Sequence, residues 1–163
     1  MYSPESREAM GGHRLMRKAD IHMGQHINCM WRVRARLTDP SSSGRLLAAN
    51  EKKHVTWYAT LDGSLGHLLP VAEKTYRRLL MLMNVMTSNI PHTAGLNPKS
   101  FRTIRQKWKD LRNPNRGIVD GDLVFQFPGL PAAARAELAR KIGTSAEEIL
   151  DDLAELDRNA AQF

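Results

Sequence analysis

A chain of 163 residues is long enough for one domain with its own core and short for two. Its composition, 42% apolar and 25% charged residues, is typical of a folded protein and excludes a wholly disordered chain. The longest apolar run, Leu79 to Met83, falls far short of the ~20 residues that a membrane-spanning helix requires, so we expect no membrane partner.

The distribution of charge and the single cysteine indicate the kind of partner and the cellular compartment. Residues 1–112 contain 19 Lys and Arg against 8 Asp and Glu (+11), whereas residues 113–163 contain 5 against 9 (−4). The basic part is expected to face an acidic partner, either nucleic acid or protein. The single cysteine, Cys29, excludes an internal disulfide and a thiolate zinc site, which favours a reducing compartment, cytosol or nucleus.

The first 70 residues have the patterns of strands and turns. Residues 1–12 lack periodicity and end in two glycines, so we expect a loose or disordered lead-in. Alternating apolar residues predict strands around 15–21 and 27–33, and the Pro, Ser and Gly of residues 38–53 predict an exposed loop. Residues 54–69 alternate on both sides of Asp62-Gly63, a pair typical of the tight turn of a β-hairpin.

The hydrophobic period changes from 2 to 3.6 after Pro70. Residues 72–89 form one amphipathic pattern, with Tyr76, Leu79, Leu80, Met83 and Met86 on its apolar face. Further helices are predicted over residues 98–110, 120–127, 131–142 and 145–157. The fold class is therefore α+β, with antiparallel strands first and helices afterwards.

The punctuation of the later helices indicates where they begin and end. Pro131 suits a first turn and Gly143 suits a helix C-terminus, whereas Thr144 with Glu147 has the spacing of a capping box. The segment "RGIVDGDL" (116–123) contains two carboxylates around a glycine, which invites a metal interpretation. The apolar residues that follow supply no further oxygen ligands, so we predict instead that Asp120 caps a helix and that no metal binds there.

No catalytic or metal-binding arrangement is predicted elsewhere. His22 and His26 are four residues apart, but Gly24 separates them in a strand-like segment without an acidic third ligand. The carboxylates of residues 147–157 alternate with apolar positions of an amphipathic helix, as on a solvated face. We therefore predict a protein that is not an enzyme and needs no cofactor.

The segment "KSFRTIRQKWKDLR" (99–112) is the sharpest candidate for nucleic-acid binding. Cations for phosphate cluster around aromatic residues suited to base stacking, and the candidate contact residues are Arg102, Arg105, Lys107, Lys109 and Arg112. The alternative is a helix that buries Phe101, Ile104, Trp108 and Leu111 and exposes its cations to water.

Candidate docking residues lie on the helix predicted over residues 72–89. Methionine more often fills an irregular core than receives a ligand, but Met81 falls near the polar stripe of this helix. We take Met81, together with the neighbouring Arg77 and Arg78, as candidates for contact with another domain or subunit.

Five sequence blocks resemble the C-terminal region of the largest subunit of the cleavage and polyadenylation specificity factor. The blocks are "GGHRLMRKADIHMGQHIN", "ATLDGSLGHLLPVAEKTYRRLLMLMNVM", "PHTAGLNPKSFR", "GIVDGDL" and "ARKIGTSAEEILDDLAELDR". They run from about Gly11 to Phe163 without a large break. The family also contains a damage-specific DNA-binding protein and a large splicing-factor subunit, so a DNA-repair or splicing paralogue is the alternative.

The resemblance implies a fold and a role. It implies a parent of three β-propellers and a helical C-terminal domain, of which residues 13–70 would be terminal blade strands and residues 71–163 the helical domain. It further implies a non-catalytic nuclear scaffold that holds WD-repeat and zinc-finger subunits and contacts pre-mRNA indirectly or weakly. An autonomous RNA-binding module is the alternative function. Where relatives carry a helix cap and an acid, this chain has Pro131 and Ala134.

Overall fold

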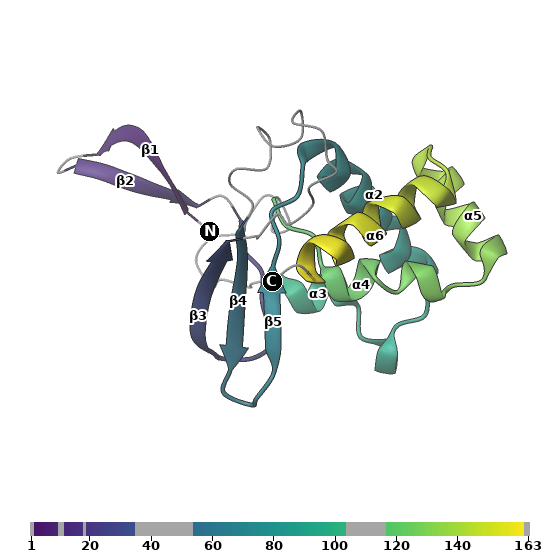
Figure 1. Cartoon of the computed structure of the whole chain (residues 1–163), viewed down its shortest axis with the longest axis horizontal. Coiled ribbons are helices and arrows are strands. Elements are labelled where there is room, and N and C mark those ends of the chain that lie inside the picture. Colours follow the sequence, from purple (N-terminus) through teal and green to yellow (C-terminus); the bar gives the residue numbers. More distant parts are fainter. Residues whose placement is uncertain (1, 10–11, 18, 35–53, 104–116, 162–163) are drawn as a thin grey trace, which may run out of the picture.

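In the computed structural model, strands precede helices along the chain (Figure 1). The structure describes residues 2–9, 12–17, 19–34, 54–103 and 117–161. The predicted loop over residues 38–53 lies outside these ranges. The mixed helix-and-sheet class is confirmed, because antiparallel strands occupy the first part of the chain and helices the second.

The described strands form two antiparallel sheets. Strands β1 (Tyr2–Ala9) and β2 (Gly12–Arg17) make a hairpin that projects from the rest of the molecule (Figure 1). Strands β3 (Ile27–Arg34), β4 (His54–Thr60) and β5 (Leu65–Leu68) form a second sheet with β4 in the middle. The predicted β4–β5 hairpin around Asp62-Gly63 is confirmed, with Gly63 at φ +87°.

The N-terminal expectations need correction. The expected loose lead-in over residues 1–12 is wrong for Tyr2–Ala9, which pair with Gly12–Arg17 in antiparallel register. The strand expected around residues 15–21 ends at Arg17, and residues 19–26 contain no strand. The reason is tertiary, since the N–H of His22 donates to the carbonyl of Arg102, far along the chain, instead of to a neighbouring strand.

Helices make up most of the described residues after Pro70. Helix α2 (Glu73–Asn89) confirms the long amphipathic prediction, and α5 (Ala132–Ile142) and α6 (Ala146–Ala161) confirm the two last helices. Between them lie a 3-10 turn (Thr93–Gly95), α3 (Pro98–Arg102), α4 (Gly121–Val124) and a second 3-10 turn (Phe127–Gly129).

Two predicted helices differ from expectation where the structure describes them. Of the helix predicted over residues 98–110, α3 covers Pro98–Arg102 and Thr103 is extended. Residues 104–110 lie outside the described ranges. The helix predicted over residues 120–127 ends at Val124 and is followed by a 3-10 turn. The backbone tightens there, because the N–H of Gln126 donates to the Leu123 carbonyl and that of Gly129 to the Gln126 carbonyl, both three residues back.

The hydrophobic core belongs to the helical part. It joins buried side chains of α2, α4, α5, α6 and the second 3-10 turn, namely Leu79, Leu82, Met83, Met86, Leu123, Val124, Phe127, Leu138, Ala139, Ile149, Leu153 and Leu156. The fully buried Phe127 lies among them. The sheet contributes no member to this cluster, so its attachment to the helices depends on other contacts.

Across the described residues, no helix combines the length and the apolar character that crossing a membrane would require.

Candidate functional site

Arg102 is the one predicted nucleic-acid contact that lies among the described residues. The other four candidates, Arg105, Lys107, Lys109 and Arg112, lie outside them. The side chain of Arg102 is only 15% exposed and faces inward. Its Nε donates to Asp120 Oδ2 at 2.9 Å, and its Nη2 lies 2.6 Å from Asp122 Oδ2.

The same guanidinium also binds the segment that leads into the large sheet. Nη1 of Arg102 donates to the carbonyls of His22 and Met23, each at 3.3 Å. With its backbone carbonyl accepting from His22 N–H at 2.9 Å, Arg102 holds residues 22–23 to the start of α4. We call Arg102, Asp120 and Asp122 the ion-pair node. A guanidinium with these partners has little capacity left for a phosphate, so we remove Arg102 from the candidate nucleic-acid surface.

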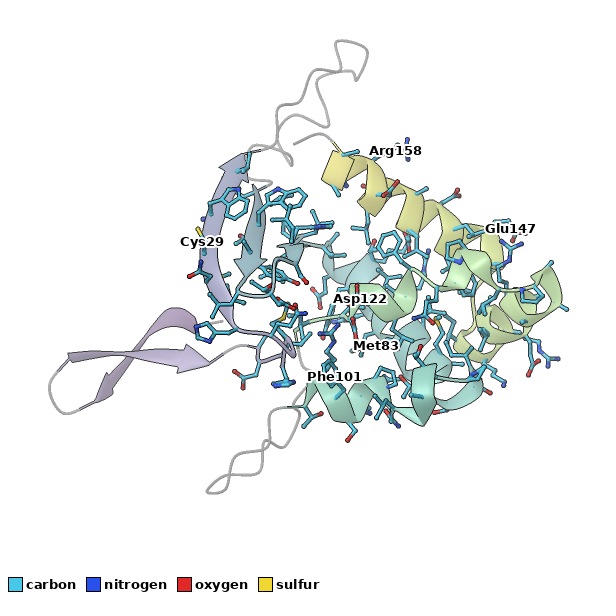
Figure 2. The ribbon with its side chains drawn as sticks, turned by 90° about the horizontal axis from the view of Figure 1, so that it is seen from below. Cys29, Met83, Phe101, Asp122, Glu147 and Arg158 are labelled. Carbon is cyan, nitrogen blue, oxygen red and sulfur yellow. The ribbon has the colours of Figure 1, made fainter. Side chains whose placement is uncertain are left out.

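Phe101 packs beside the node and is not buried in a core, which contradicts the alternative helix at this residue; Ile104, Trp108 and Leu111 lie outside the described residues. Its side chain is half exposed, lies 5.4 Å from the His22 ring in an edge-on arrangement, and has the Arg102 guanidinium 5.2 Å from its centroid. Gly24, at φ +81°, lies directly beneath it, since an added Cβ would come within 2.5 Å of Phe101 Cζ. Figure 2 shows Phe101, Asp122 and Met83 close together between the sheet and the helices.

Asp120 has two tasks at the node. As predicted, it is the N-cap of α4, where its Oδ1 accepts from the N–H of Asp122 at 3.2 Å. Its own N–H points at the sulfur of Met83 on α2, at 3.4 Å. The side chain is only 10% exposed, and its second oxygen accepts from Arg102. Its carboxylate is therefore already occupied by a helix terminus and a guanidinium.

Tyr58 of β4 lies close enough to the ion-pair node for the node's charges to affect its pKa. Burial is the main cause that raises its pKa, and the negative charges of Asp122 and Asp120 act in the same direction against the opposing charge of Arg102. The ring lies across Gly66 of β5, where an added Cβ would come within 2.3 Å of it. One face of the sheet thus adjoins the node, whereas Cys29 lies on the side of β3 away from the helices (Figure 2).

The three predicted docking residues line a single groove. It has a volume of about 480 Å³ and runs between α2 and the corner that joins α5 to α6. Its lining residues are Glu73, Lys74, Arg77, Arg78 and Met81 from α2, and Ile142, Gly143, Thr144 and Glu148 from the corner. We call this the α2 groove.

The two arginines of the groove differ in their environment. Arg78 is 16% exposed and bridges α2 to α6, with Nη1 2.9 Å from Asp152 Oδ2 and Nη2 3.5 Å from Glu148 Oε2. Arg77 is largely exposed, and its ion pair among the described residues is with Glu73, one turn back on the same helix. Met81 is 46% exposed, although its neighbours Leu82 and Met83 are buried. Arg78 is therefore structural, whereas Arg77 and Met81 are available at the surface.

Sequence reasoning missed Lys74 and the whole opposite wall of the groove. The sequence could have shown that Lys74 belongs to this face, because Lys74, Arg78 and Met81 follow the i, i+4, i+7 spacing of one helix face. Ile142 and Thr144 gave no such signal, because their approach to α2 depends on how α5 and α6 fold back onto it.

The predicted capping box at the start of α6 is displaced by one residue. The prediction paired Thr144 with Glu147, but Ser145 Oγ accepts from the N–H of Glu148 at 3.2 Å, so Ser145 is the cap. The hydroxyl of Thr144 donates instead to the Glu148 carboxylate. Gly143 at φ +76° accounts for the shift, because the left-handed turn places both Gly143 and Thr144 in the C-terminal hydrogen bonds of α5. Pro131 makes no side-chain cap for α5, as expected.

Thr144 and Arg78 also set the electrostatics of this corner. The hydroxyl of Thr144 is the main cause that lowers the pKa of Glu148, followed by the charges of Arg78 and Lys74. Within the described ranges, no three His, Cys, Asp or Glu side chains gather in an arrangement that could hold a metal ion.

Comparison with known proteins shows the family of this chain. The family model described as "CPSF A subunit region" matches residues 1–128. The chain belongs to this family.

Curated relatives match the chain along nearly its whole length. It is 48% identical over 163 residues to cleavage and polyadenylation specificity factor subunit 1 of Drosophila melanogaster, which covers 100% of this chain and 11% of that protein. A probable subunit 1 of Caenorhabditis briggsae is 38% identical over 164 residues, covering 99% and 11% respectively. Protein cft1 of Schizosaccharomyces pombe is 34% identical over 169 residues, covering 96% and 11%. The chain thus spans about a tenth of the length of these CPSF A relatives.

Proposed function

We propose that this chain is a non-catalytic scaffold segment of the nuclear machinery that cleaves and polyadenylates pre-mRNA. Membership of the CPSF A family and the names of the relatives support this role over that of a DNA-repair or splicing paralogue. In this role the helical part docks partner subunits, including the WD-repeat and zinc-finger subunits, and the strands pack with β-propellers of the same assembly.

The observation that carries the proposal is the α2 groove. Three residues singled out from the sequence as docking candidates, Arg77, Arg78 and Met81, line one groove of about 480 Å³. Met81 exposes an adaptable apolar side chain there. Arg78 contributes indirectly, because its ion pair with Asp152 holds α6 against α2 and so shapes the groove.

The sheet supports the second half of the proposal. β3 and β5 each have one edge without a partner among the described strands, and unpaired edges are templates for further strands. Trp31 and Leu65, on the same face of this sheet by register, remain 41% and 62% exposed. We propose that these strands are the terminal part of a propeller blade.

RNA contact is secondary in this proposal. Of the five predicted contact residues, Arg102 is committed to the ion-pair node. The proposed RNA surface is therefore reduced to Arg105, Lys107, Lys109 and Arg112. An autonomous RNA-binding module is disfavoured, because Arg102, the candidate cation that the structure describes, serves to hold the sheet to the helices.

The docking role can be tested by co-purification. The polypeptide that carries this chain is tagged, and the other subunits of the specificity factor that co-purify with it are quantified by mass spectrometry. Met81→Glu places a charge at the apolar part of the groove, and we expect recovery of at least one subunit to fall several-fold. Leu96→Glu is the matched control, because Leu96 is 68% exposed and lies outside the groove.

Two results would argue against the scaffold role. Absence of all other subunits from the unmodified polypeptide's purification would contradict it outright. Equal recovery with Met81→Glu and Leu96→Glu would show that docking does not use the groove.

A further inference from the structure

The wall of the α2 groove formed by α2 is cationic at one end and apolar at the other. Lys74 and Met81 are seven residues apart, which is two helical turns and about 10 Å along the axis. Arg77 and Arg78 lie between them. A partner that lies along this wall therefore meets positive charge first and an apolar side chain two turns later.

The charges of the groove are not equally available. Arg78 is held by Asp152 and Glu148, and the Glu148 carboxylate is held in turn by Thr144. The Arg77–Glu73 pair is more than 70% exposed on both sides, so it is weak and readily exchanged. Lys74 is exposed and makes no ion pair in the described part of the chain, although its charge reaches Glu148. The available charge is thus positive.

The apolar end of the groove comes from two elements. Met81 of α2 and Ile142, the last residue of α5, both line it, and Ile142 is partly exposed although it also packs against the core. Methionine adjusts its shape to a partner more easily than a branched side chain. One large apolar side chain from outside would fit between Met81 and Ile142.

The lining favours a protein partner over RNA. None of the nine lining residues is aromatic, so the groove offers no platform for base stacking. Two of them, Glu73 and Glu148, are carboxylates, and each is already engaged, Glu73 by Arg77 and Glu148 by Arg78 and Thr144. A carboxylate-bearing protein segment would meet the charge of Lys74 and would compete with Glu73 for Arg77.

We propose that the α2 groove binds an acidic amphipathic helix of a partner subunit. The helix would place one large apolar side chain between Met81 and Ile142 and a carboxylate two turns away on Lys74 and Arg77, the usual anchor spacing of a helix bound in a groove. This inference rests on the proposed scaffold function and adds the chemistry of the partner.

Site-specific photocrosslinking tests the identity of the occupant. A benzophenone amino acid replaces Met81 in the polypeptide that carries this chain, the assembled complex is irradiated, and the crosslinked peptide is sequenced by mass spectrometry. We expect a segment of another subunit with acidic residues flanking an apolar one at helical spacing. A crosslink to RNA, to a basic or uncharged segment, or to the same polypeptide would overturn the proposal, as would no crosslink.

Reversing the charge of Lys74 tests whether the partner is acidic, and it leaves Met81 unchanged. Lys74→Glu should lower recovery of the crosslinked subunit by at least about three-fold, since it turns an attraction at the groove into a repulsion. Lys99→Glu is the matched control, because Lys99 is also exposed but lies outside the groove. Equal recovery with both variants would overturn the acidic nature of the partner.

Failure of this inference can be told apart from failure of the proposed function. If subunits co-purify with the unmodified polypeptide but the crosslink reaches a segment that is not acidic, the scaffold role stands and the partner chemistry is wrong. If no subunit co-purifies with the unmodified polypeptide, the scaffold role itself fails.

Discussion

The ion-pair node and the α2 groove both contain arginines paired with carboxylates, but these arginines have different roles. At the node, Arg102 is 15% exposed and its guanidinium is divided among two carboxylates and two backbone carbonyls. At the groove, Arg77 is 72% exposed and pairs with one carboxylate of its own helix. Burial and the number of partners, rather than charge itself, separate a cation that holds the fold from one that can meet a partner.

The largest expected difference between the node and the groove appears when Arg102 and Arg77 are each replaced and the stabilities of the two variants are compared. Arg102→Met should lower the free energy of unfolding by about 3 kcal/mol, because it leaves Asp120 nearly buried without its cation. Arg77→Met should change it by less than about 0.5 kcal/mol, as for most exposed pairs. Urea denaturation measures both, and hydrogen exchange localises the first to residues 19–24 and α4. Similar effects of the two variants would refute the distinction.

The contact of Phe101 with Gly24 is the next test. Gly24→Ala should cost about 2 kcal/mol, since it combines a left-handed φ with a Cβ that collides with the Phe101 ring. Gly63→Ala has a similar φ of +87° with open space around it, and should cost about 1 kcal/mol from backbone strain alone. The difference between the two variants isolates the ring contact. If Gly24→Ala proves no worse than Gly63→Ala, Phe101 does not anchor the node.

A smaller effect separates the two tasks of Asp120. Asp120→Asn keeps a good N-cap but loses the charge that Arg102 binds, whereas Asp120→Ala loses both. The alanine variant should therefore be less stable than the asparagine variant by about 1 kcal/mol, the usual value of an N-cap. Helical chemical shifts of Gly121–Val124 report the same loss locally. Equal stability of the two variants would mean that capping contributes nothing here.

The smallest expected effect is a pH dependence at the groove. The pKa of Glu148 is lowered chiefly by the Thr144 hydroxyl, so the ionised form is the one that the folded state favours. Its contribution to stability is complete above the carboxyl's unfolded pKa and is lost as the pH falls through the lowered folded pKa. Thr144→Val should move the pKa of Glu148 upward toward its ordinary value, as followed by NMR titration. An unchanged titration would show that Thr144 does not act on this carboxylate.

The elements that could be predicted from the sequence are those with local causes. The periodicity of residues 72–89, the left-handed glycine at Gly143 and the Asp62-Gly63 turn each depend on neighbours within a few residues, and each was confirmed. The cap at Asp120 belongs to the same class, because its acceptor and donor are two residues apart. The one-residue shift of the α6 cap shows the limit, since Thr144 and Ser145 are both good caps and the preceding turn decided between them.

The partners of Arg102 and the strand at residues 2–9 escaped prediction for a different reason. A cluster of cations and aromatic residues predicts nucleic-acid binding only while the partners of each cation are unknown. Asp120 is 18 residues away from Arg102, and His22 is 80 residues away, so no local pattern could have shown either pairing. The β1 strand likewise depends on its pairing with β2 more than on its own composition.

The amino-acid sequence by itself determined that strands precede helices, the Asp62-Gly63 turn, the Asp120 cap and the family, because these follow from propensity, periodicity and ordered motifs along the chain. Only the tertiary structure decided which cations are committed and which are free, and that α5 and α6 complete a groove beside α2. The physical reason is that the strength of a charge depends on its burial and its partners, and both are set by residues distant in the sequence.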